Sequence, residues 1–100
     1  MSFQQTLTED RRLSLLLVLL ESSGYSANAF LMRDVAEQVY GHVATNDQVA
    51  TDIAWLAEQG LVTSKTVGRV TLATLTRRGE DVASGRGSVP GVKKRGPSGA

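Results

Sequence analysis

Apolar residues crowd the segment from Leu13 to Leu20, and this pattern predicts a helix. Thr8 can cap that helix, and Gly24 marks its end or lies just beyond it. Leucine and valine occur on every side of the segment, so such a helix must be covered on more than one face. A chain of 100 residues has few other segments with which to cover all faces of this helix. We therefore expect a homodimer through this first helix. The alternative is that the rest of the chain wraps it.

Two further segments have helical spacing. Ser26 or Asn28 can cap a helix over residues 29–40, which ends at Gly41. Its predicted buried stripe is Leu31, Val35 and Val39.

A third helix is expected to start at Thr45, because Thr45-x-x-Gln48 is a capping box. Gly60 ends it, and its core face holds Val49, Ile53 and Leu56. Two helices joined by a four-residue turn that contains glycine form the helix-turn-helix pattern.

The remainder of the chain divides at Gly85. Residues 61–65 and 69–75 are rich in valine, threonine and leucine, which predicts a β-hairpin with its turn at residues 67–68. Thr76 can cap a short helix over residues 77–84. From Gly85 onward glycine, serine, proline and basic residues dominate without apolar periodicity. The expected organisation is one domain over residues 1–84 and a flexible basic tail over residues 85–100.

The phrases "WLAEQGLV" and "ATLTRRGEDVA" give the chain a resemblance to a known family. They resemble the end of the recognition helix and the exit from the wing in winged helix-turn-helix regulators of the MarR, PadR and ArsR types. The resemblance implies a mainly α fold with a small β-hairpin: a three-helix core, a two-stranded wing and a short C-terminal helix. It also implies a DNA-binding regulator of transcription. The whole chain is also similar to small proteins encoded in Mu-like prophages.

The charge distribution complicates that expectation. Residues 1–85 hold seven Lys and Arg against ten Asp and Glu, a net charge of −3, and residues 86–100 add four cations. The folded part therefore lacks the strongly basic composition usual for DNA-binding proteins. No Lys or Arg lies between Thr45 and Leu61, where the recognition helix would be.

The outer arc of the third helix would face DNA in a winged helix. That arc is predicted to hold Asp47, Gln48, Thr51, Asp52, Trp55, Glu58 and Gln59. Base contacts are expected from Asn46, Gln48 and Thr51, since amides suit adenine and threonine suits the thymine methyl group.

Phosphate contacts would have to come from outside this helix. We expect them from Lys65 and Arg69 on the wing and from Arg77 and Arg78 just after it, with Arg33 on the second helix and the basic tail as further candidates. Solvated surface charge is the alternative for each.

Trp55 is the only tryptophan and falls on the predicted polar arc. The wing could fold over it, or it could contact a protein partner or a second copy of the chain. The latter possibility leads to an alternative function, a winged-helix protein-interaction module that does not bind DNA directly.

Other chemistry finds little support. His42 is the single histidine and cysteine is absent, so no metal site, cofactor or catalytic group is suggested, and we expect no enzyme. The apolar run at residues 13–20 is too short to span a membrane. A cleaved secretory signal ending at Ala29 is a remote alternative to a cytoplasmic protein.

Overall fold

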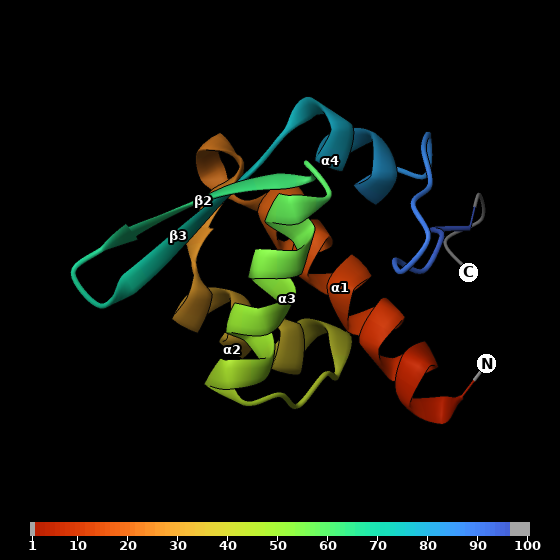
Figure 1. Ribbon diagram of the computed structural model, residues 1–100, viewed down its shortest axis with the longest axis horizontal. Helices are drawn as coiled ribbons and strands as arrows, with labels where there is room; N and C mark the ends of the chain where they lie inside the picture. Colours follow the sequence, from red (N-terminus) through yellow and green to blue (C-terminus); the bar gives the residue numbers. More distant parts are fainter. Residues whose placement is uncertain (1, 97–100) are drawn as a thin grey trace.

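The computed structural model describes residues 2–96, which form a mainly helical fold with a small antiparallel sheet (Figure 1). The sequence predicts this balance of helix and strand correctly. In chain order the elements are α1 (Phe3–Glu21), a 3-10 turn η1 (Ser23–Tyr25), β1 (Ser26–Asn28), α2 (Ala29–Tyr40), α3 (Asn46–Glu58), β2 (Val62–Val67), β3 (Val70–Leu75) and α4 (Arg77–Ala83).

The N-terminal cap of α1 lies six residues earlier than predicted. Ser2, not Thr8, caps it, through a capping box in which Ser2 Oγ accepts from Gln5 N and Gln5 Oε1 accepts from Ser2 N. The predicted start was wrong because the side chains of residues 3–7 are exposed, so this first part of the helix has no buried apolar face to indicate it. The capping box at Thr45 and Gln48 is present as expected, with both hydrogen bonds at 3.0 Å.

The sheet has three strands rather than the expected two. The predicted hairpin is β2 paired with β3, and β1 adds to the other edge of β3, with Ala27 opposite Ala73. Strand β1 has only three residues, too few to show alternation in the sequence. It places Ala27 in the core and leads directly into α2, whose first turn Asn28 caps through Leu31 N at 2.8 Å.

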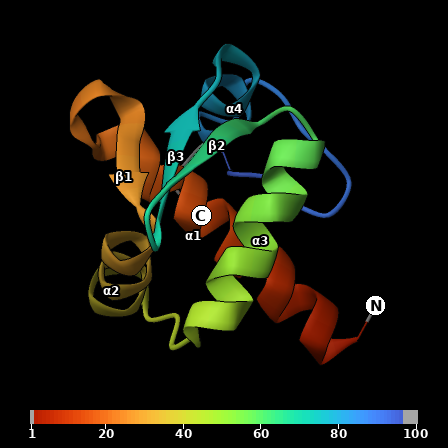
Figure 2. The same ribbon diagram turned by 60° about the vertical axis from the view of Figure 1, so that its left-hand side comes forward.

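Helix α1 runs through the centre of the molecule, with α2, α4 and β3 packed against it (Figure 2). Leu15, Leu16 and Leu19 are fully buried there. The chain therefore wraps this helix by itself, and the apolar surface that predicted a homodimer through it is covered. Among residues 2–96, no helix is long and apolar enough to cross a membrane.

Residues 85–96 differ from the flexible tail expected of them. Val89 and Val92 are buried in the core cluster, and Lys93 N donates to Glu9 O at 3.2 Å. Arg95 Nη1 donates to Ala83 O at 3.2 Å. The segment has no regular secondary structure, and it packs along α1 because Val89 and Val92 are buried in the core. We refer to residues 85–96 as the C-terminal strap; the last four residues of the predicted tail lie outside the described residues.

Candidate nucleic-acid interface

The solvent-facing arc of α3 is rotated from the arc that the sequence predicts. After the first residue of the helix, Asn46, the exposed residues are Asp47, Gln48, Ala50, Thr51, Ala54 and Glu58. Two predicted members, Asp52 and Trp55, instead face α1 and the C-terminal strap. The exposed arc is therefore less acidic and has smaller side chains than expected.

Asp52 is withdrawn from solvent by two arginines of α1. Its side chain is 2% exposed, and Arg11 Nε donates to its Oδ2 at 2.5 Å. Arg12 Nε lies 3.5 Å from Oδ1. The prediction that Asp52 lies on the outer arc was wrong, because the two arginines hold its carboxylate inside the fold.

Trp55 is covered by the C-terminal strap and not by the wing. The Arg12 guanidinium lies 3.9 Å above the centre of the indole ring, a cation–π contact. Arg12 Nη1 also donates to Gly91 O at 3.0 Å, which holds the strap against the same ring. Trp55 thus joins α1, α3 and the strap within one chain, and its side chain is half-buried.

The contact between Gly91 and Trp55 predicts a stability effect. A Cβ atom at Gly91 would lie 2.6 Å from Trp55 Cζ2. Gly91→Ala is expected to lower the free energy of unfolding by about 2 kcal/mol, through overpacking and backbone strain, and to shift the Trp55 emission. Gly24→Ala is the control, since its φ is also positive but no atom lies within 4 Å. Equal losses in the two variants, with unchanged emission, would show that the strap does not press on the indole ring.

The predicted base-contact residues all lie on the exposed surface of α3. Asn46 is its first residue, and Gln48 and Thr51 follow on the exposed arc. Gln48 Oε1 is engaged by Thr45 N, so its amide nitrogen is the atom left to meet a ligand. The three side chains lie in the N-terminal half of α3, and all three are exposed to solvent, as base contacts would require.

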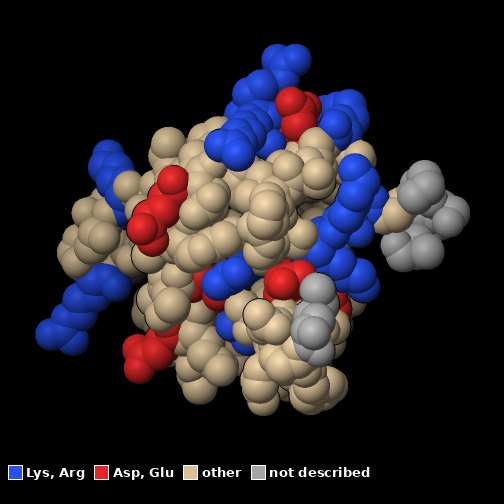
Figure 3. Space-filling view, turned by 45° about the vertical axis from the view of Figure 1, so that its right-hand side comes forward, with Lys and Arg blue, Asp and Glu red and all other residues tan. Residues whose placement is uncertain are grey.

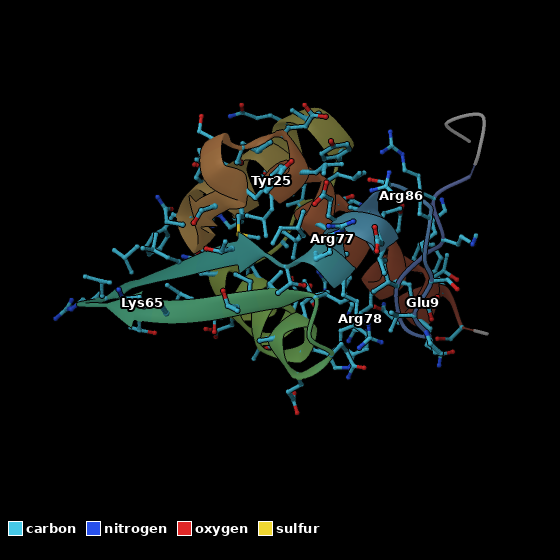
Figure 4. All side chains as sticks on the ribbon, turned by 90° about the horizontal axis from the view of Figure 1, so that it is seen from above. Glu9, Tyr25, Lys65, Arg77, Arg78 and Arg86 are labelled. Atoms are coloured by element: carbon cyan, nitrogen blue, oxygen red, sulfur yellow. The ribbon has the colours of Figure 1, made fainter. Side chains whose placement is uncertain are left out.

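The four predicted phosphate-contact residues are exposed as well. Lys65 projects from β2 near the end of the hairpin (Figure 4). Arg69 lies in the turn between β2 and β3. Arg77 and Arg78 form the first turn of α4, where Arg78 Nη1 donates to Gln59 O at 2.8 Å. Arg78 therefore sits at the C-terminal end of α3, where a cation is favoured by the helix dipole.

These four cations differ from most others in having no acidic partner. Within residues 2–96, no carboxylate oxygen lies within 4.0 Å of Lys65, Arg69, Arg77 or Arg78. Lys and Arg side chains gather along the upper edge of the molecule, over α4 (Figure 3). The sequence identifies these residues as candidates, and the structure places Arg78 next to the C-terminal end of α3.

His42 lies in the loop between α2 and α3 and links α1 to that loop. Its Nε2 is 3.2 Å from Asp10 Oδ2, and Lys93 Nζ is 3.8 Å from Asp10 Oδ1. Nearby, burial raises the pKa of the Tyr40 hydroxyl, Glu21 adds to the rise, and Arg95 opposes it. Residues 2–96 contain no cluster of three His, Cys, Asp or Glu side chains able to hold a metal ion.

Arg11 and Arg12 are the site residues that sequence reasoning missed. They set the orientation of α3 by holding Asp52 and Trp55 on its inner side. The sequence does show Asp52 and Trp55 three residues apart on one predicted helix and Arg11 and Arg12 together on another. It does not show that these two pairs of residues are in contact.

Comparison with known proteins finds relatives among phage and bacterial proteins. The chain is 45% identical over 91 residues to "Uncharacterized protein gp26" of Escherichia phage Mu, which covers 91% of this chain and 93% of that protein. It is 46% identical over 63 residues to an uncharacterized protein of Haemophilus influenzae, which covers 63% of this chain and 60% of that protein. No family model and no solved structure matches. The similarity to Mu-like phage proteins is confirmed, and the chain belongs to the family that includes gp26 of Escherichia phage Mu.

Proposed function

We propose that this chain is a phage- or prophage-encoded winged-helix protein that binds duplex DNA in the cytoplasm and regulates transcription. The element order supports the fold assignment: three helices, then a hairpin, then a short helix, with β1 on the far edge of the sheet. Gly60, at a φ of 75°, makes the left-handed turn that leads from α3 into the hairpin.

The observation that carries the proposal is the match between the free cations and the exposed arc of α3. DNA affinity comes mainly from neutralised phosphates, and phosphate contacts position a protein while base contacts give specificity. Lys65 and Arg69 lie on the hairpin that follows α3, and Arg78 binds Gln59 O at the C-terminal end of α3. Cations therefore lie on the hairpin and beside the C-terminal end of a helix that has none of its own.

The exposed arc of α3 suits close approach to a groove. Ala50 and Ala54 are small and exposed, so the helix backbone can come near base edges. Thr51 can contact a thymine methyl group, and Asn46 can pair with adenine. Removing Asp52 from the arc leaves two carboxylates there, Asp47 and Glu58, and a carboxylate can accept from the cytosine amino group.

Charge-reversal variants test the proposal. Arg69→Glu and Arg77→Glu are each expected to weaken binding to a random duplex by about tenfold at low salt, because each removes a phosphate contact and adds repulsion. Arg33→Glu makes the same change in net charge on α2, where Arg33 lies 3.4 Å from Asp34, and is expected to have a smaller effect. Electrophoretic mobility shift or fluorescence anisotropy gives the affinities. Equal weakening by all three variants would remove the hairpin and α4 from the interface.

A second candidate is a protein-interaction module that does not touch DNA directly. The observation that favours it is the pair of exposed carboxylates, Asp47 and Glu58, on the face that DNA would meet. Trp55 adds little to this candidate, because Arg12 stacks on its ring and its side chain is half-buried. Under this candidate all of the charge-reversal variants would bind DNA as poorly as the unmodified chain.

A further inference from the structure

A polar pocket lies between the N-terminal halves of α1 and α3, and its volume is about 320 Å³. Figure 2 shows the N-terminal half of α1 emerging beside α3. The walls of the pocket are polar side chains from the two helices: Thr8, Arg11, Arg12, Asp47, Gln48 and Thr51. Two of the predicted base-contact residues are therefore part of it. We call this feature the α1/α3 pocket.

The ion pairs beside the α1/α3 pocket contain an excess of positive charge. Arg11 Nε donates to Asp52 Oδ2 at 2.5 Å, and Arg12 Nε lies 3.5 Å from Oδ1 of the same carboxylate. Two largely buried guanidinium groups thus share one carboxylate. Buried charges are stabilised by opposite charges, so these three side chains leave one positive charge without a counterpart.

Arg11 is the arginine that keeps unused hydrogen-bond donors. Within residues 2–96 its side chain makes one hydrogen bond, from Nε, which leaves the N–H groups of Nη1 and Nη2. Neither of these atoms is buried without a partner, so both reach solvent. Arg12 is engaged elsewhere, because its Nη1 donates to Gly91 O and its guanidinium stacks on Trp55. A ligand in the pocket would therefore meet the donors of Arg11.

We propose that the α1/α3 pocket holds a backbone phosphate of bound duplex DNA, with Arg11 Nη1 and Nη2 donating to its non-bridging oxygens. The proposal rests on the DNA-binding function proposed above. A guanidinium carries paired N–H groups that match two oxygens of a phosphate. The hydroxyls of Thr8 and Thr51 line the same pocket and can donate to the same group. The phosphate also supplies the negative charge that the arginine pair lacks.

The position of the pocket explains how a helix without Lys or Arg can lie against DNA. Arg78 lies at the C-terminal end of α3 and the hairpin follows it, whereas the pocket lies beside the N-terminal half of α3. A phosphate held there is next to Gln48 and Thr51, the candidates for base contacts. Phosphate contacts fix the register in which such side chains meet the bases. Arg11 would thus position the end of α3 that the other cations do not reach.

Asp47 opposes a phosphate on the same wall of the pocket. Its side chain is exposed, so water and salt screen its charge. The charge of Arg11 is screened less, because that side chain is 14% exposed. We therefore expect the attraction to exceed the repulsion.

Arg11→Lys separates the phosphate contact from the ion pair. Lysine can keep a positive charge beside Asp52, but its single ammonium group cannot also serve a phosphate. Binding to random duplex DNA is expected to weaken by about three- to tenfold at low salt, and the salt slope should become shallower by about 1, the contribution of one phosphate. Unchanged Trp55 emission verifies that the fold is intact. Arg33→Lys, on α2, is the matched control and should leave affinity and slope unchanged.

Thr8→Glu tests the pocket without changing the ion pair. A carboxylate on the wall repels a phosphate and can pair with Arg11, so duplex affinity is expected to fall by about tenfold. Thr6→Glu is the matched control, because it adds the same charge to α1 about 200° around the helix axis. Thr6 does not line the pocket, and its variant is expected to weaken binding by at most about threefold.

Val39→Glu is a second control, on α2. The sequence predicts a buried stripe of Leu31, Val35 and Val39 there, and this prediction was wrong. Leu31 is 48% exposed and Val39 is 65% exposed, because α2 turns Met32 and Ala36 into the core instead. A charge at Val39 therefore disturbs little packing, and Val39 does not line the α1/α3 pocket. Its effect on duplex affinity should match that of Thr6→Glu.

The outcomes separate the phosphate contact from the proposed function. Equal weakening by Thr8→Glu and Thr6→Glu, or an Arg11→Lys variant with unchanged affinity and slope, overturns the contact. The proposed function then still stands if Arg69→Glu weakens binding. An unmodified chain that does not bind duplex DNA overturns both. Inorganic phosphate that saturates the pocket at micromolar concentration without DNA, followed by Trp55 emission, would assign it to a free anion and also overturns the contact.

Discussion

Asp52→Ala is expected to lower the free energy of unfolding by about 3 to 5 kcal/mol. The carboxylate is 2% exposed, and the side chains of Arg11 and Arg12 are 14% and 17% exposed. Removing the acid leaves two largely buried guanidinium groups without an opposite charge. Arg11 is the more affected, because it loses its 2.5 Å hydrogen bond to Asp52, whereas Arg12 keeps its contacts with Gly91 O and the Trp55 ring.

Chemical denaturation of the variant measures this loss directly. Asp47→Ala, on the exposed arc of the same helix, provides the control and is expected to change stability by less than about 0.5 kcal/mol. The Asp52 variant should also change the Trp55 emission, since Arg12 contacts both side chains. If Asp52→Ala and Asp47→Ala are equally mild, Asp52 does not organise the packing of α1 against α3.

Gly79→Ala is expected to destabilise the protein by about 3 kcal/mol, through overpacking against backbone atoms that cannot move aside. A Cβ atom at Gly79 would lie 2.0 Å from Leu61 O and 2.7 Å from Leu75 Cδ1. Alanine normally stabilises a helix relative to glycine by about 1 kcal/mol, so the predicted sign is opposite to that of helix propensity. Gly79 is required here for space, because the first turn of α4 packs directly on the chain leaving α3.

Two hydrogen bonds show why Leu61 O cannot retreat from Gly79. Thr76 N donates to Leu61 O at 3.1 Å, and Thr76 Oγ1 donates to Gly60 O at 2.7 Å. Thermal unfolding of Gly79→Ala and Gly87→Ala gives the comparison, since a Cβ atom at Gly87 would have its nearest neighbours at 3.7 Å. A Gly79 variant as stable as the Gly87 variant would mean that the corner between α3 and α4 is looser than described.

The features that the sequence predicts correctly are those set by local interactions. Thr45 and Gln48 satisfy each other within one turn of helix, and Gly60 and Gly41 adopt the left-handed conformations that end helices. The hairpin follows from valine and threonine flanking a glycine turn. Each of these signals needs only a few neighbouring residues.

The features that it misses depend on contacts between distant segments. Ala27 becomes a strand residue only because Ala73 lies beside it, and Val89 and Val92 are buried only because α1 is there to receive them. The same holds for the candidate interface. Asp52 appears on the polar arc of α3 by spacing, and only the placement of Arg11, 41 residues away, turns it inward.

The candidate site is predicted in composition but not in arrangement. Lys65, Arg69, Arg77 and Arg78 are identifiable from their positions around the hairpin. Whether each has an acidic partner is a question of tertiary structure, and the structure leaves all four without one in the described part of the chain.

A salt titration of binding to random duplex DNA tests the central claim most directly. Non-specific affinity is expected in the micromolar range at low salt and should fall steeply as salt rises, because bound phosphates release counterions. With four free cations around α3, the logarithm of the affinity should fall with a slope of about −2 to −4 against the logarithm of salt concentration. A chain that shows no binding at low salt, or binding that salt does not weaken, would contradict the account.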